Sequence, residues 1–118
     1  MELKYFNLSE FDSPDHEGSH VNMDSNFLQL LDKAREIAGV PFRITSGYRT
    51  KEHNAKVGGV QGSSHTKGVA VDIAISSGSE RWVILNALIQ VGVRRFGISS
   101  NFLHADVDAD KPNAVWTY

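Results

Sequence analysis

The run Val69-Ala-Val-Asp-Ile-Ala-Ile75 constrains the fold of this chain more than any other segment. It is nearly all apolar and rich in β-branched residues, which is typical of a strand buried on both faces. Asp72 stands at its centre. A buried carboxylate needs a partner, because an unpaired charge is costly to remove from water. The segment therefore predicts an internal strand of a covered sheet that carries a partnered carboxylate.

The other predicted elements alternate between helices and strands. Apolar residues recur at three- and four-residue spacing between Asp24 and Gly39, which are the expected cap and end of an amphipathic helix. A second helix is expected from Glu80 to Val91, with Ser79 as its N-cap. The remaining elements are a short helix over Lys51–Val57 after Thr50, and strands over Phe42–Thr45, Val93–Ile98 and Phe102–Asp108. This order predicts an α+β fold in which a small antiparallel sheet is packed against helices on one side.

We expect a single domain over residues 1–118, because one hydrophobic core typically serves roughly 100–200 residues. Turn and cap formers dominate the first part of the chain. We interpret residues 1–22 as an N-terminal arm that packs on the domain. Only three of its side chains are expected to reach the core, namely Phe6, Leu8 and Phe11.

Composition excludes several kinds of partner and site. Twelve Lys and Arg against fourteen Asp and Glu give a net charge of −2, so the basic field that dominates nucleic-acid binding is missing. The chain has no cysteine, and any metal site must use His, Asp and Glu. Glu2, Lys4 and Glu10 interrupt the stretch where a signal peptide needs an apolar run, and no run approaches the roughly 20 residues that cross a bilayer. We expect a monomer synthesised in the cytoplasm, without membrane insertion.

Two histidines and one aspartate are candidate metal ligands. His65 lies in a Gly/Ser-rich loop that enters the strand of Asp72, and alternation along the last strand places His104, Asp106 and Asp108 on one face. Two His and one Asp, with a fourth position left for water, form a catalytic zinc site, whose ion activates that water and polarises a carbonyl. Taken singly, His65 is also explained as a surface histidine and Asp72 as the partner of an arginine, so spacing alone leaves these alternatives open.

A wider set of strings extends this pattern. They are Ser46-Gly-Tyr-Arg-Thr50, His53-Asn54, Val57-Gly-Gly-Val60, Ser63-Ser-His65, Gly68-Val-Ala-Val-Asp72 and Phe102-Leu-His-Ala-Asp106. Their order and spacing resemble the zinc D-Ala-D-Ala carboxypeptidase family, which includes phage endolysins and peptidoglycan endopeptidases, over roughly Asn7 to Asp106. The resemblance implies zinc as the cofactor and His65, Asp72 and His104 as its ligands. It also implies the small α+β fold that these peptidases share with the hedgehog signalling domain.

The resemblance assigns two further residues to the substrate. Arg49 matches an arginine that binds a substrate carboxylate or the polarised carbonyl oxygen, and its planar fork of donors suits either role. A structural salt bridge is the alternative for this residue. Ser63 matches a serine at the pocket edge, which either binds substrate or shapes the loop.

The general base is the point at which the chain departs from the family. Many members carry an Asp or Glu three residues before the last histidine, where this chain has Asn101, an amide that cannot take a proton. Asp106 is the nearest carboxylate with the right facing, so we predict it as the base, with orientation of a ligand as the alternative. His53 and Asp108 are weaker candidates, expected to be a helix-surface histidine and a solvated carboxylate.

The sequence therefore predicts a zinc-dependent peptidase that hydrolyses amide bonds in peptidoglycan stem peptides, as an endopeptidase or a D,D-carboxypeptidase. Because no wall-binding module is attached, we expect a compact lysin of a phage or prophage that acts at the bacterial cell wall. The alternative is a catalytically silent zinc-binding module with a structural or wall-recognition role, which Asn101 favours. A plain α+β protein without a metal would require the three candidate ligands to coincide by chance.

Overall fold

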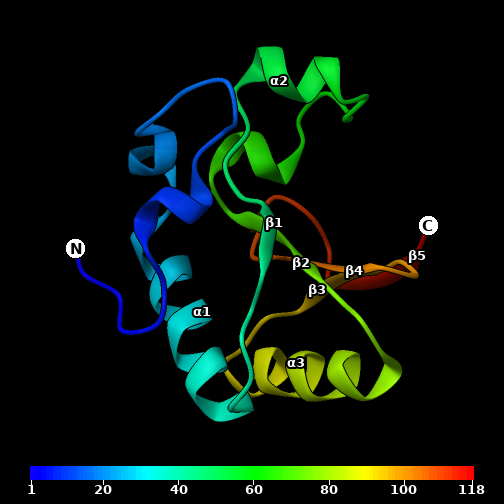
Figure 1. Cartoon of the computed structure of the whole chain (residues 1–118). Helices are drawn as coiled ribbons and strands as arrows, with labels where there is room; N and C mark the ends of the chain where they lie inside the picture. The colour runs from blue at the N-terminus through cyan, green and yellow to red at the C-terminus, as the bar shows by residue number, and fades with distance from the viewer.

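A sheet runs through the middle of the molecule, with α3 on one side of it and α2 beyond the other (Figure 1). The computed structural model describes residues 1–118. Its helices are α1 (Ser25–Ala38), α2 (Lys51–Lys56) and α3 (Gly78–Gln90), with three short 3-10 helices, η1 (Leu8–Phe11), η2 (Ser19–Asn22) and η3 (Ser64–Lys67). Its strands are β1 (Ile44–Ser46), β2 (Ala70–Ala74), β3 (Arg95–Ile98), β4 (Phe102–Asp106) and β5 (Ala114–Thr117).

The five strands lie in the order β1-β2-β4-β3-β5. β2 pairs with β1 and β4, and β4 pairs with β3, all antiparallel. β5 pairs with β3 in parallel. The α+β class is confirmed, but the sheet is mixed rather than antiparallel, because the terminal segment adds a strand that the sequence does not predict. This strand depends on pairing with β3, about twenty residues earlier, which no local pattern reveals.

Helix caps account for most of the helix boundaries. The side chain of Asp24 caps α1 and Gly39 ends it with a φ of 69°, both as predicted. In contrast, α3 begins earlier than predicted, because Ser77 rather than Ser79 is its N-cap and accepts a hydrogen bond from the backbone N–H of Glu80. No helix in the structure combines the length and the apolar character needed to span a bilayer.

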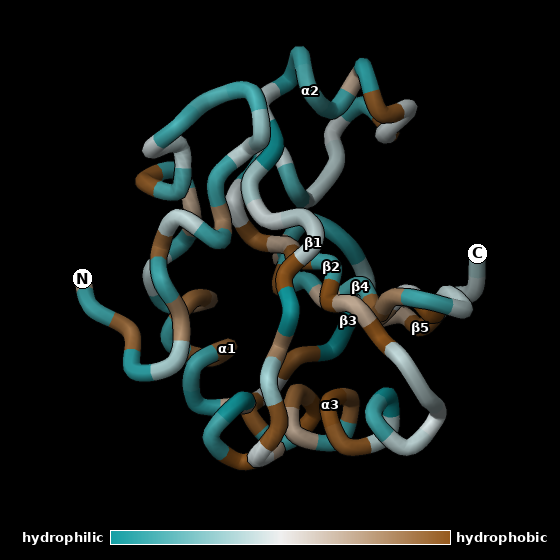
Figure 2. Tube along the Cα trace, viewed as in Figure 1, coloured by the Kyte–Doolittle hydropathy of each residue, from teal (hydrophilic) through white to brown (hydrophobic).

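The two faces of the sheet differ in chemistry. One face packs against α1 and α3, and Figure 2 shows apolar positions along α3. Its fully buried side chains include Val71, Ile73, Leu103 and Ala105. The opposite face carries Asp72 and His104, which are direct partners in the β2–β4 register. The prediction that this strand is buried on both faces is confirmed, with the apolar core on one side and polar groups on the other.

Residues 1–22 lie against α1 and the loop that follows β1. The backbone N–H groups of residues 4 and 5 donate to Asp32 at 2.9 Å each, and the carbonyl of Phe11 accepts from the backbone N–H of Tyr48 at 2.9 Å. Phe6 and Phe11 belong to the core, and Leu8 is partly buried against it. The arm thus contacts the loop that leads from β1 to Arg49.

Candidate metal centre

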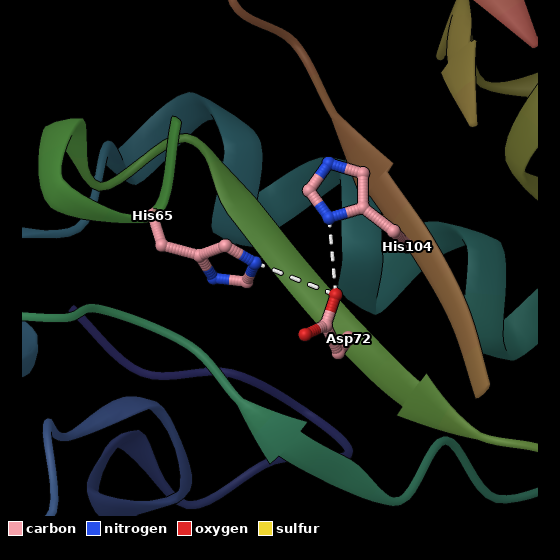
Figure 3. Close-up of side chains that lie close together, drawn as sticks. All are labelled: His65, Asp72 and His104. Carbon is pink, nitrogen blue, oxygen red and sulfur yellow. Dashed lines mark hydrogen bonds and ion pairs between the residues drawn. The ribbon is translucent and has the colours of Figure 1, made fainter. Parts of the chain in front are cut away.

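His65, Asp72 and His104 point toward one another beside the sheet (Figure 3). His104 Nδ1 lies 3.0 Å from Asp72 Oδ1, and His65 Nε2 lies 3.4 Å from the same oxygen. One donor atom from each residue lies within 4.8 Å of the other two, and the three residues are buried. The structure therefore brings together the three residues predicted as ligands.

His65 is positioned by the loop before β2. The hydroxyl of Ser63 caps η3 by accepting from the backbone N–H of His65 at 3.2 Å, and His65 Nδ1 donates to the carbonyl of Gly47 at 2.8 Å. Gly68 ends η3 with a φ of 74°. A Cβ at that position would lie 2.0 Å from the carbonyl oxygen of Asn22, so only glycine lets the loop pass the arm. The loop shape leaves Nε2 as the nitrogen that faces the centre.

His104 is supported by a carboxylate. Its Nε2 donates to Asp106 Oδ2 at 2.7 Å. The other oxygen of Asp106 accepts from Arg95 Nε at 2.8 Å and from the backbone N–H of Asp108 at 3.1 Å. A carboxylate on the outer nitrogen of a ligand histidine fixes the ring orientation and makes the inner nitrogen a better ligand.

This placement does not fit the predicted role of Asp106 as general base. Asp106 is 1% exposed, and its Oδ2 meets the nitrogen of His104 that faces away from Asp72, while its Oδ1 is taken by Arg95 and the backbone N–H of Asp108. A base must reach the water that attacks the substrate. The geometry favours the alternative, in which Asp106 orients His104. Strand alternation correctly places both side chains on one face, but it does not tell which ring nitrogen the carboxylate meets.

The donor set fits zinc. Each imidazole gives its outer nitrogen to an acceptor, which allows the inner nitrogen to lose its proton and bind a metal. Tetrahedral bonds of about 2.0–2.2 Å place neighbouring ligand atoms roughly 3.3 Å apart. The separations of 3.0 and 3.4 Å at Asp72 Oδ1 are close to that value. Three protein ligands leave one position open, which is typical of catalytic zinc sites.

The charges at the centre also favour a cation. Burial raises the pKa of the Asp72 carboxyl, but hydrogen bonds from His104 and His65 outweigh it and hold the pKa well below its usual range. Burial lowers the pKa of the His104 imidazole, whereas hydrogen bonds to Asp106 and Asp72 raise it above its usual value overall. The space between the two carboxylates is therefore favourable for positive charge.

Arg49 lies at the edge of the same group. Its Nη2 is 3.3 Å from Asp72 Oδ2, its Nη1 is 3.3 Å from Asn54 Oδ1, and its Nε donates to the hydroxyl of Ser46 at 3.0 Å. The guanidinium also lines the cavity beside the ligands. Substrate binding and a structural salt bridge were the two roles predicted for Arg49. The structure is compatible with both, because Arg49 forms a salt bridge with Asp72 and also lines the cavity.

The three ligands line a cavity of about 500 Å³, a size typical of small-ligand sites. Ser63 also lines it, although the hydrogen bond of its hydroxyl serves the loop. His53 and Asn101 are not part of the lining. Four further residues line the cavity without having been predicted from the sequence, namely Arg95, Lys111, Trp116 and Tyr118. The spacing of two between Trp116 and Tyr118 is the one local signal, because it places both on the same face of a strand.

Asp108 is not the solvated carboxylate that the sequence predicts. It is 4% exposed, and it accepts from the hydroxyl of Ser64 at 2.7 Å and from Lys67 Nζ at 3.0 Å. Lys111 Nζ lies 3.4 Å away. Asp108 thereby ties the segment after β4 to the loop that carries His65. Ser64 and Lys67 lie about forty residues earlier, so alternation within one strand cannot find them.

Comparison with known proteins agrees with this site. The family model described as Peptidase M15 matches residues 4–106. No curated protein matches the chain. The matched range contains all three candidate ligands and ends with β4, so that β5 lies beyond it. The resemblance to the zinc D-Ala-D-Ala carboxypeptidases is confirmed, and the chain belongs to the peptidase M15 family.

Proposed function

We propose that the protein is a zinc-dependent peptidase that hydrolyses amide bonds in peptidoglycan stem peptides at the bacterial cell wall, as a lysin of a phage or prophage. The observation that carries the proposal is the convergence of His65 Nε2, Asp72 Oδ1 and His104 Nδ1 beside an open cavity. Membership of the peptidase M15 family supports a metallopeptidase. The choice of stem peptides rests on the resemblance of the sequence strings.

His65, Asp72 and His104 would hold the zinc ion. When bound, zinc would polarise the scissile carbonyl and activate water at neutral pH. The Gly47 carbonyl and the Asp106 carboxylate keep the two imidazoles oriented, since each accepts a hydrogen bond from an outer ring nitrogen. The chain thus supplies a rigid set of three donors on one side of the substrate.

Arg49 would bind an anionic part of the substrate. Its hydrogen bonds to Asp72 and Asn54 are 3.3 Å long, longer than the roughly 2.7–2.9 Å of strong charge-assisted bonds. A substrate carboxylate, or a carbonyl oxygen that gains negative charge, can therefore replace these contacts at small cost. Peptidoglycan stem peptides carry carboxylates, which suit the fork of donors on a guanidinium.

Cleavage of purified peptidoglycan tests the proposal. We expect new peptide termini to form with zinc and not with a chelator, and mass spectrometry identifies the bond. An internal cut indicates an endopeptidase, and release of a terminal D-alanine indicates a D,D-carboxypeptidase. The His104→Ala variant serves as the negative control because it lacks a ligand. Absence of cleavage by protein that carries one equivalent of zinc contradicts the proposal.

A silent zinc-binding module is the second candidate. The carboxylates that line the cavity are Asp72 and Asp106. The first is a candidate ligand, and the second is hydrogen-bonded to His104 and Arg95. Asn101 replaces the acidic residue of the family pattern. This shortage of a free carboxylate favours a binding role, and stoichiometric zinc without cleavage would support it.

A further inference from the structure

β5 brings two aromatic side chains to the candidate metal centre. Trp116 lies in this strand, Tyr118 directly follows it, and both line the cavity. The indole of Trp116 lies 5.4 Å from the ring of His104 between centroids. β5 lies beyond the residues that the family model matches, so this wall belongs to the chain's own C-terminal segment.

Gly97 makes room for these side chains in the sheet. In register it lies between His104 of β4 and Trp116 of β5. A Cβ on Gly97 would lie 2.6 Å from Trp116 Nε1 and 2.8 Å from the hydroxyl oxygen of Tyr118. The missing side chain therefore leaves a notch next to His104, and the tip of Tyr118 occupies it.

The rest of Tyr118 remains accessible from the cavity. The residue is 69% exposed, and its ring packs against Phe102 with centroids 5.1 Å apart. Tyr118 thus lies in the cavity wall with most of its surface open to a bound molecule. This arrangement is typical of an aromatic residue with an apolar body and a polar tip that contacts a ligand.

The hydroxyl is suited to donate a hydrogen bond. Burial and the nearby Asp72 carboxylate raise the pKa of the Tyr118 phenol above its usual value, although the contact with Trp116 opposes this rise. The phenol therefore stays protonated at neutral pH. The phenolic O–H of Tyr118 has one hydrogen that it can donate to an acceptor on a bound molecule.

We propose that Tyr118 is a catalytic residue that donates its phenolic hydrogen to the carbonyl oxygen of the scissile amide. This inference rests on the proposed peptidase function. Water attack on the amide carbon places negative charge on that oxygen, and a donor aimed at it lowers the barrier. Arg49 follows β1 and Tyr118 follows β5, at the two ends of the sheet order, so the donors approach Asp72 and His104 from opposite sides.

The Tyr118→Phe variant tests the assignment, because it removes only the hydroxyl and keeps the ring against Phe102. We expect kcat for peptide cleavage to fall about 10–100-fold, the effect of one hydrogen bond to a charged group. KM and zinc content are expected to stay within about twofold of the wild-type values. The lost hydrogen bond strengthens only as the carbonyl oxygen gains charge, and the three zinc ligands are unchanged. Tyr5→Phe is the matched control, since the Tyr5 hydroxyl bonds to Glu36 on α1.

Acetohydroxamate binding gives a second measurement that needs no turnover. This probe presents an anionic oxygen to a metal, and the fluorescence of Trp116 beside His104 reports its binding. We expect Tyr118→Phe to weaken binding to the zinc-loaded protein about tenfold and Tyr5→Phe to leave it unchanged. Wild-type kcat and wild-type hydroxamate affinity in Tyr118→Phe would overturn the inference while leaving the peptidase proposal intact. Weakened hydroxamate binding in a protein that cleaves no peptide would support the Tyr118 contact and overturn the peptidase proposal.

Discussion

His65 and His104 offer their inner nitrogens to the same oxygen of Asp72, yet different groups support the two rings. The outer nitrogen of His65 donates to the backbone carbonyl of Gly47, whereas that of His104 donates to the side chain of Asp106. A carbonyl is neutral, and the path of the chain fixes its place. A carboxylate is charged, and other side chains fix it. The loop side of the centre therefore depends on backbone geometry, and the sheet side depends on charge.

The groups behind these two acceptors extend the difference. On the loop side, the backbone next to Gly47 is tied to the N-terminal arm, because Tyr48 N–H donates to the carbonyl of Phe11 at 2.9 Å. On the sheet side, Arg95 donates to Asp106 at 2.8 Å. A larger side chain at Gly47 should perturb His65 selectively. Removal of the charge on Asp106 should perturb His104 selectively.

Removing either histidine should have the largest effect, and the effect should be the same on both sides. His65→Ala and His104→Ala each leave two protein ligands, too few for a stable zinc site. We expect zinc content, measured by mass spectrometry of the dialysed protein, to fall from one equivalent to near zero, and peptide cleavage to fall to background. His16→Ala, at an exposed position of the arm, is the control. Full zinc content in either ligand variant would rule out the site.

Asp106→Asn should separate the two sides. The amide keeps the shape of the carboxylate but loses its charge, so it orients His104 less firmly and makes it a weaker ligand. We expect zinc affinity, measured by competition with a chromophoric chelator, to fall about 10–100-fold, while turnover at saturating zinc changes far less. Asp110→Asn, whose side chain is 83% exposed, is the matched control. Unchanged zinc affinity with abolished turnover would instead restore Asp106 as the base.

Gly47→Ala is the corresponding test on the loop side, with a smaller expected effect. The new Cβ would lie 2.8 Å from both Cα and O of Phe11, so the loop or the arm must move. We expect the free energy of unfolding in denaturant to fall by about 1–3 kcal/mol and zinc affinity to fall severalfold. Gly78→Ala is the control, because no atom lies within 4 Å of its Cβ position. Wild-type stability and affinity in Gly47→Ala would show that the carbonyl is not needed.

The ligands could be predicted because their determinants are local. Asp72 stands inside an apolar run, His65 precedes it in a glycine-rich loop, and alternation places His104 with Asp106. The supports could not be predicted, since they come from distant segments. Gly47 is 18 residues from His65 in sequence, and Asp108 is buried by partners more than forty residues away. The sequence strings therefore identify the residues that converge, but not the groups that support them.

β5 shows the same limit for the fold. Val115-Trp-Thr-Tyr118 is too short to be recognised as a strand by periodicity. Ala114–Thr117 becomes a strand because β3 offers a free edge for pairing. Gly97 in β3 then allows Trp116 to approach His104. A glycine inside a strand is a sequence signal for close approach of another group, and here it marks the aromatic wall.

The smallest effect is expected from pH, in protein whose metal has been removed with a chelator. Asp106 at 2.7 Å and Asp72 at 3.0 Å raise the pKa of His104 above 6.5, despite the opposing effect of burial. The folded state thus binds this proton more tightly than the unfolded state. The resulting stability is fully present below about pH 6.5 and is lost as pH rises through the raised pKa. The melting temperature should therefore fall by several degrees as the pH rises to 9.

Zinc should reverse the direction of this dependence, because a ligand histidine must be deprotonated and protons compete with the metal at low pH. The gap in melting temperature between zinc-loaded and chelated protein is expected to widen from pH 6 to pH 9 in thermal scans. The His104→Ala variant without metal is the control for the other titrating groups. Its melting temperature should fall less as pH rises, because His104 is absent. A chelated wild-type protein as stable at pH 9 as at pH 6 would contradict a charged His104 held between two carboxylates. Packing and backbone geometry, rather than charge, would then hold His104 in place, as they hold His65.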